Sequence, residues 1–203
     1  MNEIQNSVWE NAWTYEVYRT EIDRLLEENK TTGSNQSEDY LHYTRMNVAR
    51  MNRLDKRTEV EERLAQEAQG TGVTKILVLT EAWCGDAAQV IPVAEKIMAE
   101  LGISARYILR DEHLDIMDAF LTEGGRSIPK FIFLNDALEV LGSWGPRPDE
   151  VQQMVMDRKQ AEVQEPYTEF SKKVQLWYAK DKTRSIQEEF VSALQKSVLT
   201  FSD

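Results

Sequence analysis

Apolar residues in the first 70 positions of the chain recur at the spacing of helices. Within 9–26 they follow one another at intervals of three and four, which places them on one face of an α-helix. A second stretch, 37–64, has the same spacing. The segment between them, 31–36, is rich in Thr, Gly, Ser and Asn and predicts a loop. We therefore expect residues 1–72 to form a helical extension that packs on the core of the protein.

The pattern changes at residue 73, where short apolar runs begin to alternate with helical repeats. The run Lys-Ile-Leu-Val-Leu-Thr is typical of a strand that is covered on both faces. The order β-α-β-α-β-β follows, with strands expected at 75–80, 103–109, 130–134 and 138–141 and helices at 86–101 and 114–121. This order predicts an α/β core domain over 73–148.

Helical spacing returns after this domain. Asp149 is a residue type that often caps a helix, and apolar positions at helical intervals follow it. Two further helices are expected around 170–178 and over 186–199, with a break at the Glu165–Pro166 step. Residues 149–203 are therefore expected to form a helical C-terminal segment.

The charge of the chain narrows the classes of partner. The 203 residues carry a formal net charge of -11, so we expect no nucleic acid and no membrane surface as partner, because both require a basic surface. The acidic, amphipathic N-terminus does not resemble a signal peptide. A single cysteine excludes an intramolecular disulfide and favours a reducing, cytoplasmic setting. The sequence leaves the oligomeric state open.

That cysteine is the main candidate for chemistry. Trp83-Cys84-Gly85-Asp86-Ala87 directly follows an expected strand and begins an expected helix. The N-terminus of a helix lowers the pKa of a thiol, whereas a nearby carboxylate such as that of Asp86 raises it, and the sequence does not decide between the two. We expect Cys84 to be exposed and reactive; the alternative is a buried structural cysteine.

The segment resembles the Trp-Cys-Gly-x-Cys active site of the thioredoxin family. Pro92 lies eight positions after Cys84, where the family has a proline in its active-site helix. Pro129 follows Ile128 and lies 45 positions after Cys84, close to the spacing of the family's cis-proline. Gly145 lies 16 positions further on, where the family has a glycine beside the site. Residues 110–112, 121–129 and 144–148 also resemble a bacterial thioredoxin-like subgroup in which the second cysteine is often missing.

The resemblance implies a thioredoxin-like fold, in which helices cover both faces of a mixed central sheet, here with helical N- and C-terminal extensions. It also implies a site with Cys84 as the catalytic residue and a substrate-binding groove formed by Trp83, Gly85, Asp86, Ala87, Ile128, Pro129, Trp144 and Gly145. Trp144 either covers the cysteine or fills the core.

Two departures from the family pattern limit the chemistry. Ala87 occupies the position of the resolving cysteine, so the chain cannot act as a dithiol reductase, because a mixed disulfide would have no internal thiol to release it. Val78 occupies a position where thioredoxins have a buried acid. Glu81, three residues before the cysteine, replaces the threonine of peroxiredoxins and argues against a peroxidase.

Our leading hypothesis is a monothiol protein that exchanges with protein or small-molecule disulfides through Cys84, with an external thiol such as glutathione as co-substrate. The alternatives are a non-catalytic module that binds peptides or proteins, and a transferase that binds a small thiol. We expect no metal, because His42 and His113 have no partner at ligand spacing. One basic stripe is either a solvated helix face or an anion site facing the cysteine; it comprises Arg45, Arg50, Arg53, Lys56 and Arg57.

Overall fold

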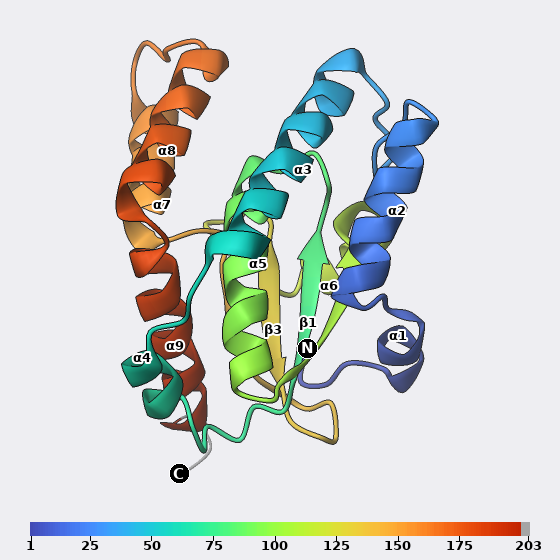
Figure 1. The fold of residues 1–203 in the computed structure, drawn as a ribbon, viewed down its shortest axis with the longest axis vertical. Helices are drawn as coiled ribbons and strands as arrows, with labels where there is room; N and C mark the ends of the chain where they lie inside the picture. The colour runs from blue at the N-terminus through green and yellow to red at the C-terminus, as the bar shows by residue number, and fades with distance from the viewer. Residues whose placement is uncertain (200–203) are drawn as a thin grey trace.

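A mixed four-stranded sheet lies at the centre of the computed structural model, which describes residues 1–199 (Figure 1). The strands are β1 (Lys75–Thr80), β2 (Ser104–Leu109), β3 (Lys130–Leu134) and β4 (Val140–Trp144). Their order is β2-β1-β3-β4, with β2 parallel to β1 and the other two pairs antiparallel. The sheet and the helices before and after it confirm the expected α/β class with helical extensions.

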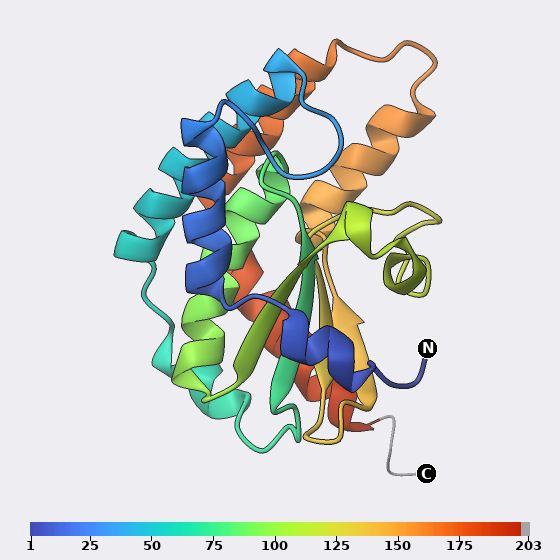
Figure 2. The same ribbon diagram turned by 90° about the vertical axis from the view of Figure 1, so that its right-hand side faces the viewer.

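Side chains of β1 alternate between two apolar clusters, one on each face of the sheet. Ile76 and Val78 belong to the larger cluster. Seven helices within residues 1–199 also contribute residues to this cluster, among them α2 (Tyr15–Glu27), α3 (Glu38–Arg57), α5 (Gly85–Glu100) and α9 (Arg184–Leu199). Leu77 and Leu79 belong to the other cluster, beside α1 (Asn6–Asn11) and α6 (Leu114–Met117) (Figure 2). Helices therefore cover both faces, and β1 with its following helix α5 lies in the interior.

The N-terminal extension contains more breaks than the apolar spacing predicts. The expected helix over 9–26 is divided into α1 and α2, because Trp13 pairs with Tyr107 of β2 through two backbone hydrogen bonds of 2.8 and 3.0 Å. Thr14 then caps α2 through its side-chain oxygen. The expected stretch 37–64 is divided in the same way: α3 ends at Arg57, and a short helix, α4 (Glu62–Glu67), follows.

The C-terminal segment forms α7 (Asp149–Gln160), α8 (Tyr167–Asp181) and α9. The prediction that Asp149 caps α7 is wrong: Pro148 is at the cap position, and no side chain accepts a capping hydrogen bond there. Helix α9 packs on β4, where Phe190 lies edge-on to three core aromatic rings. Whether 72 and 148 are true domain boundaries stays a prediction.

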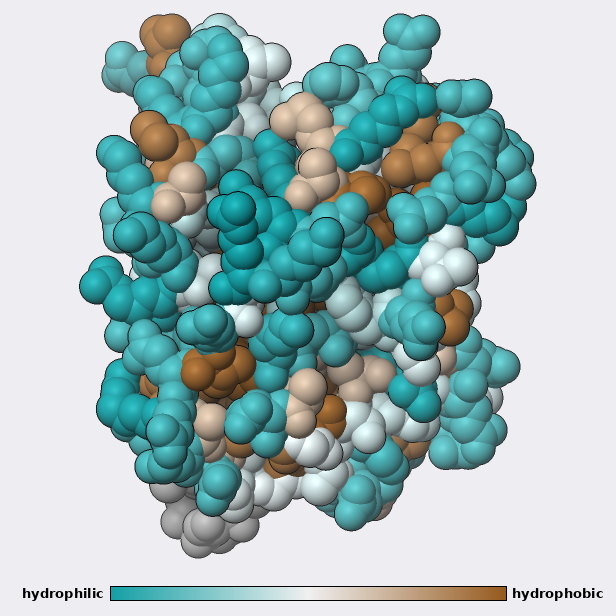
Figure 3. Space-filling model, in the orientation of Figure 1, coloured by the Kyte–Doolittle hydropathy of each residue, from teal (hydrophilic) through white to brown (hydrophobic). Residues whose placement is uncertain are grey.

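Two other elements of the core differ by more than one residue from their expected bounds. Helix α6 ends at Met117 rather than at residue 121, and β4 begins at Val140 because Leu138 adopts a left-handed conformation in the turn before it. The face shown in Figure 3 is mainly hydrophilic, with small separate apolar areas. Within residues 1–199, no helix is both long and apolar enough to cross a bilayer.

Candidate functional site

Cys84 lies where the strand β1 leads into the helix α5. It is the N-cap residue of α5, and its carbonyl accepts the first helical hydrogen bond, from Ala88 at 3.2 Å. Its thiol donates a hydrogen bond to the carbonyl oxygen of Ile128 at 3.2 Å. The following peptide bond, Ile128–Pro129, is cis. The sulfur is therefore placed between a helix N-terminus and the loop that contains the cis-proline.

The surroundings of the sulfur favour the protonated thiol. Cys84 is half-buried rather than exposed, and burial is the largest cause that raises its pKa, to about 11. The negative charge of Asp86 raises the pKa further, while two backbone N–H groups and the positive charge of Arg147 oppose the rise. Loss of solvation thus outweighs the effect of the helix N-terminus at this position.

Asp86 joins this site to the C-terminal segment. Its carboxylate accepts a hydrogen bond of 2.9 Å from the Tyr178 hydroxyl of α8 and forms an ion pair of 3.0 Å with Arg147. Only 16% of the Asp86 side chain and 11% of the Arg147 side chain is exposed. Because both charges are largely removed from water, each depends on the other for stabilisation. The contribution of α8 to this site has no signal in the sequence.

A pocket of about 560 Å³ opens in front of Cys84, between the β1–α5 junction and the helices α7 and α8. Five of the nine expected site residues line it: Trp83, Cys84, Gly85, Asp86 and Ile128. The other lining residues are Arg110, Arg126, Ser127, Arg147, Val155, Arg158, Lys159, Tyr167, Phe170, Ser171, Val174 and Gln175. Helices α7 and α8, predicted from the sequence only as part of a C-terminal segment, thus form one wall of the pocket, which we call the Cys84 pocket.

The other four expected site residues lie behind this surface. Ala87 and Pro129 are buried. Trp144 packs its ring against Phe131 and Phe190, with ring centroids 5.8 and 5.5 Å away, and so fills the core rather than covering the cysteine.

Gly145 shapes the chain behind the pocket through its backbone. Its φ is 109°, a backbone conformation that residues with a side chain rarely adopt. A Cβ atom at this position would lie 2.4 Å from the carbonyl oxygen of Pro129. The Gly145–Pro146 bond is a second cis peptide bond, which no feature of the sequence predicts. Glycine is therefore required for the close approach of the two chain segments.

Cations dominate the lining of the Cys84 pocket although the protein as a whole is acidic. Five basic residues line it, against the single carboxylate of Asp86: Arg110, Arg126, Arg147, Arg158 and Lys159. Three of these pair with acids, at 2.7 Å for Arg110–Asp111, 2.6 Å for Arg126–Asp118 and 3.0 Å for Arg147–Asp86. The remaining two form no ion pair within residues 1–199.

Arg158 is held in the wall by apolar and backbone contacts. Its guanidinium lies over the rings of Tyr167 and Phe170, at 5.8 and 5.3 Å from their centroids, and donates to the carbonyl of Glu165 at 3.1 Å. A cation that is positioned without a carboxylate partner is available to an anionic ligand.

The basic stripe of α3 does not form an anion site facing Cys84. Arg53 and Arg57 line a different pocket, and Arg45 donates to Asn29. Arg50 comes nearest, since its guanidinium lies 3.9 Å from where a Cβ of Gly85 would be. The cations in front of the cysteine come instead from α7, from loops and from a short 3₁₀ helix, η1 (Arg110–Glu112).

One buried acid near the site was not recognised from the sequence as a site residue. Glu81 directly follows β1 and is fully buried, and its carboxylate accepts a 3.0 Å hydrogen bond from the backbone N–H of Asp111. Burial is the largest cause that raises its pKa, to about 7. The signal in the sequence is an acid placed between an apolar strand and the Trp-Cys pair. The expected position, Val78, is instead an apolar core residue.

The fold and this arrangement define an α/β protein with a cysteine at a helix start opposite a cis-proline. A sequence model of the family described as Thioredoxin matches residues 33–164, so the chain belongs to the thioredoxin family. No curated protein matches the chain. No group of three potential metal-ligating side chains occurs in the part of the chain that the structure describes.

Two solved structures share the fold. One is the crystal structure of a protein of unknown function, PA1234, from Pseudomonas aeruginosa, with 14% sequence identity and a TM-score of 0.61; the match covers 95% of this chain and 98% of that one. The other is the crystal structure of an HIV epitope scaffold, with 12% identity and a TM-score of 0.54, covering 90% and 98% of the two chains. At these identities the likeness extends to the fold, including the helical extensions.

Proposed function

We propose that the Cys84 pocket binds an acidic thiol-bearing molecule of the size of glutathione, and that binding rather than rapid thiol exchange is its main function. The observation that supports this most is the lining of the pocket, with five basic side chains and one carboxylate. Its volume of about 560 Å³ lies within the range typical of small-molecule sites. The aromatic rings of Tyr167 and Phe170 supply apolar contact area.

Three features argue against a fast thiol catalyst. The Cys84 thiol is engaged with the Ile128 carbonyl, its pKa is raised to about 11, and Ala87 supplies no second sulfur. A thiol reacts as the thiolate, so a raised pKa leaves only a small reactive fraction at neutral pH.

S-methylglutathione tests the binding function, because it keeps the charges of glutathione and has no thiol to exchange. By calorimetry we expect saturable binding that survives Cys84→Ser. Arg158→Gln should weaken this binding at least about ten-fold, since a hydrogen bond to a charged group contributes about 1.5–3 kcal/mol. Lys172→Gln is the matched control: it removes the same charge from an exposed position on α8 that does not line the pocket. Equal affinities in the two variants, or no saturable binding, would refute the proposal.

Monothiol exchange is a second candidate, supported by the position of the Cys84 sulfur in the wall of the pocket. The thiolate would attack one sulfur of a disulfide, forming a bond to Cys84 and releasing the other sulfur as a thiolate that takes up a proton. An external thiolate would then attack the mixed disulfide and release Cys84, forming a new disulfide that contains the external thiol. The charge of Asp86 opposes the first step, because it disfavours the attacking thiolate.

Turnover of a small mixed disulfide with reduced glutathione separates the two candidates. Exchange requires turnover that is lost in Cys84→Ser. Binding alone predicts the same background rate in both proteins while S-methylglutathione still binds.

A further inference from the structure

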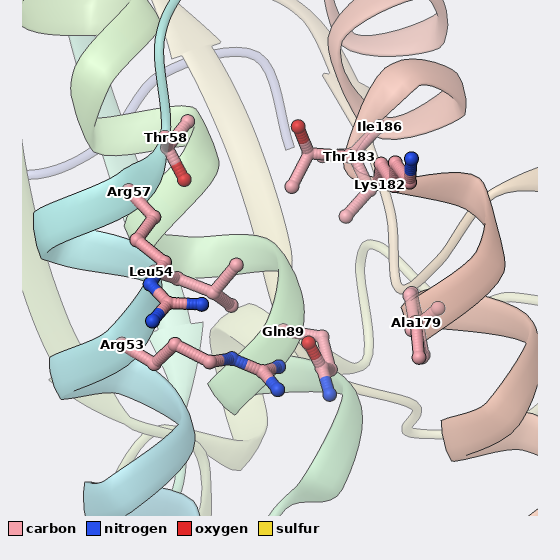
Figure 4. A pocket seen from close by; sticks show the side chains of 10 residues that line it. Arg53, Leu54, Arg57, Thr58, Gln89, Ala179, Lys182, Thr183 and Ile186 are labelled. Carbon is pink, nitrogen blue, oxygen red and sulfur yellow. The ribbon is translucent and has the colours of Figure 1, made fainter.

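A second pocket, of about 370 Å³, lies where α3, α5 and the α8–α9 junction meet (Figure 4). It shares no lining residue with the Cys84 pocket. Two hydrogen bonds link the walls of the two pockets: Gln89 donates to Gln175 at 2.6 Å, and Tyr178 donates to Asp86 at 2.9 Å. We call this second cavity the α3 pocket, and it is a site separate from the one described above.

The α3 pocket combines an apolar floor with a basic rim. Leu54, Tyr178 and Ile186 are each less than 10% exposed and form the floor. The rim has cations from opposite walls and no carboxylate: Arg53, Arg57 and Lys182. In Figure 4 the side chain of Arg53 extends from α3 across the opening toward Gln89. None of the three cations forms an ion pair among residues 1–199.

One polar group in this lining also lacks a partner. The hydroxyl of Thr58, directly after the last residue of α3, is buried and makes no hydrogen bond within the described chain. Buried polar groups are normally satisfied, so an unpaired hydroxyl in a pocket wall is a donor that a ligand can use. It adds a neutral donor to the three cationic side chains.

We propose that the α3 pocket binds a phosphate monoester whose organic group is small and apolar. Arg53 and Arg57 hold the phosphate, because the planar guanidinium group matches phosphate oxygens with paired donors. Lys182 contributes charge from the facing wall, and the organic group rests on the floor formed by Leu54 and Ile186. A volume of about 370 Å³ accommodates a ligand of this size.

Phenyl phosphate is the probe, with inorganic phosphate as its comparison, both measured by calorimetry at low salt on the full chain. Phenyl phosphate is expected to bind with a Kd of about 1 mM or below and more tightly than inorganic phosphate, because only the ester reaches the apolar floor. Arg53→Gln and Arg57→Gln should each weaken binding about ten-fold. Both residues are exposed, so circular dichroism should show an unchanged fold.

Two control variants decide where the probe binds. Lys56→Gln removes the same charge from the same helix at an exposed position outside the pocket, and its Kd should stay within about two-fold of the wild type. Arg158→Gln, in the Cys84 pocket, should have as little effect. The proposal would be overturned if Lys56→Gln weakened binding of phenyl phosphate as much as Arg57→Gln does, or if Arg158→Gln weakened it instead. The absence of saturable binding would overturn it as well. All of these results are independent of glutathione binding.

Discussion

The reactivity of Cys84 in the folded protein can be compared with its reactivity in the urea-unfolded chain. With a pKa of about 11, about one thiol in ten thousand is ionised at pH 7 in the folded state. An unfolded cysteine, with a pKa of about 8.5, is about 3% ionised. The difference in thiolate fraction is about 300-fold. The intrinsic nucleophilicity of a thiolate rises with its pKa, with a Brønsted slope of about 0.4–0.5. The folded-state thiolate is therefore about 10- to 18-fold more nucleophilic, which offsets part of the roughly 300-fold difference in thiolate fraction.

Folding should therefore slow alkylation of Cys84 by iodoacetamide about 20- to 30-fold at pH 7, before any steric protection is added. The pH profile separates the two effects. A raised pKa makes the folded-state rate climb about ten-fold per pH unit through pH 9, whereas steric shielding alone leaves a plateau above pH 8.5. Quenched samples analysed by mass spectrometry give the rate, and circular dichroism at each pH confirms that the protein is still folded.

Asp86→Asn provides the internal control for this reasoning. It removes the charge that raises the pKa of the thiol and leaves Arg147 without its partner, so both changes favour the thiolate. The variant should react faster than the wild type at pH 7. A folded wild type that reacts as fast as the unfolded chain, or a plateau near pH 8, would refute the assignment of Cys84 as a protonated thiol.

Three further outcomes concern stability, measured by urea unfolding. Burial raises the pKa of Glu81 from 4.5 to about 7, so the folded state holds a proton that the unfolded state loses. The free energy of unfolding of the wild type, relative to that of Glu81→Gln, should therefore fall by about 3 kcal/mol between pH 4.5 and pH 8. A difference between the two proteins that does not change with pH would contradict this. Gly145→Ala should lower the free energy of unfolding by about 2 kcal/mol or more, because the new Cβ would collide with the Pro129 carbonyl. An unchanged free energy of unfolding would show that this segment of the chain can shift. Phe190→Ala should lower the free energy of unfolding by about 3–5 kcal/mol, because it leaves a cavity against β4. A decrease below about 1 kcal/mol would mean that α9 packs more loosely on the sheet than described.

The position of Cys84 at a helix start could be predicted from the sequence because it depends on neighbours along the chain. An apolar strand, a Trp-Cys pair and a helix repeat are consecutive, so the sequence alone places the thiol at a helix start. Pro129 lies far along the chain, and only the resemblance to thioredoxins indicated that it belongs to the same site. The structure shows the carbonyl before it 3.2 Å from the sulfur.

The basic pocket could not be predicted, because its residues come from segments that meet only after folding. Arg158 and Tyr167 belong to α7 and α8, more than 70 positions after Cys84. The basic stripe in α3 was the cluster visible in the sequence, yet its Arg53 and Arg57 line a different pocket. Proximity along a helix identifies a common face, but not what that face meets.

The sequence by itself determined the α/β class, the order of strands and helices in the core, and the absence of a resolving cysteine, because each follows from local periodicity or from a count of residues. Tertiary structure decided the protonation of Cys84 and the charge of the surface in front of it. Both depend on burial and on electrostatic interaction with groups such as Asp86 and Arg147, whose strength is set by distance and solvent exclusion in the folded chain. The ion pair of Arg147 with Asp86 and the hydrogen bond from Tyr178 form only once the segment after β4 and the helix α8 have packed against the first turn of α5.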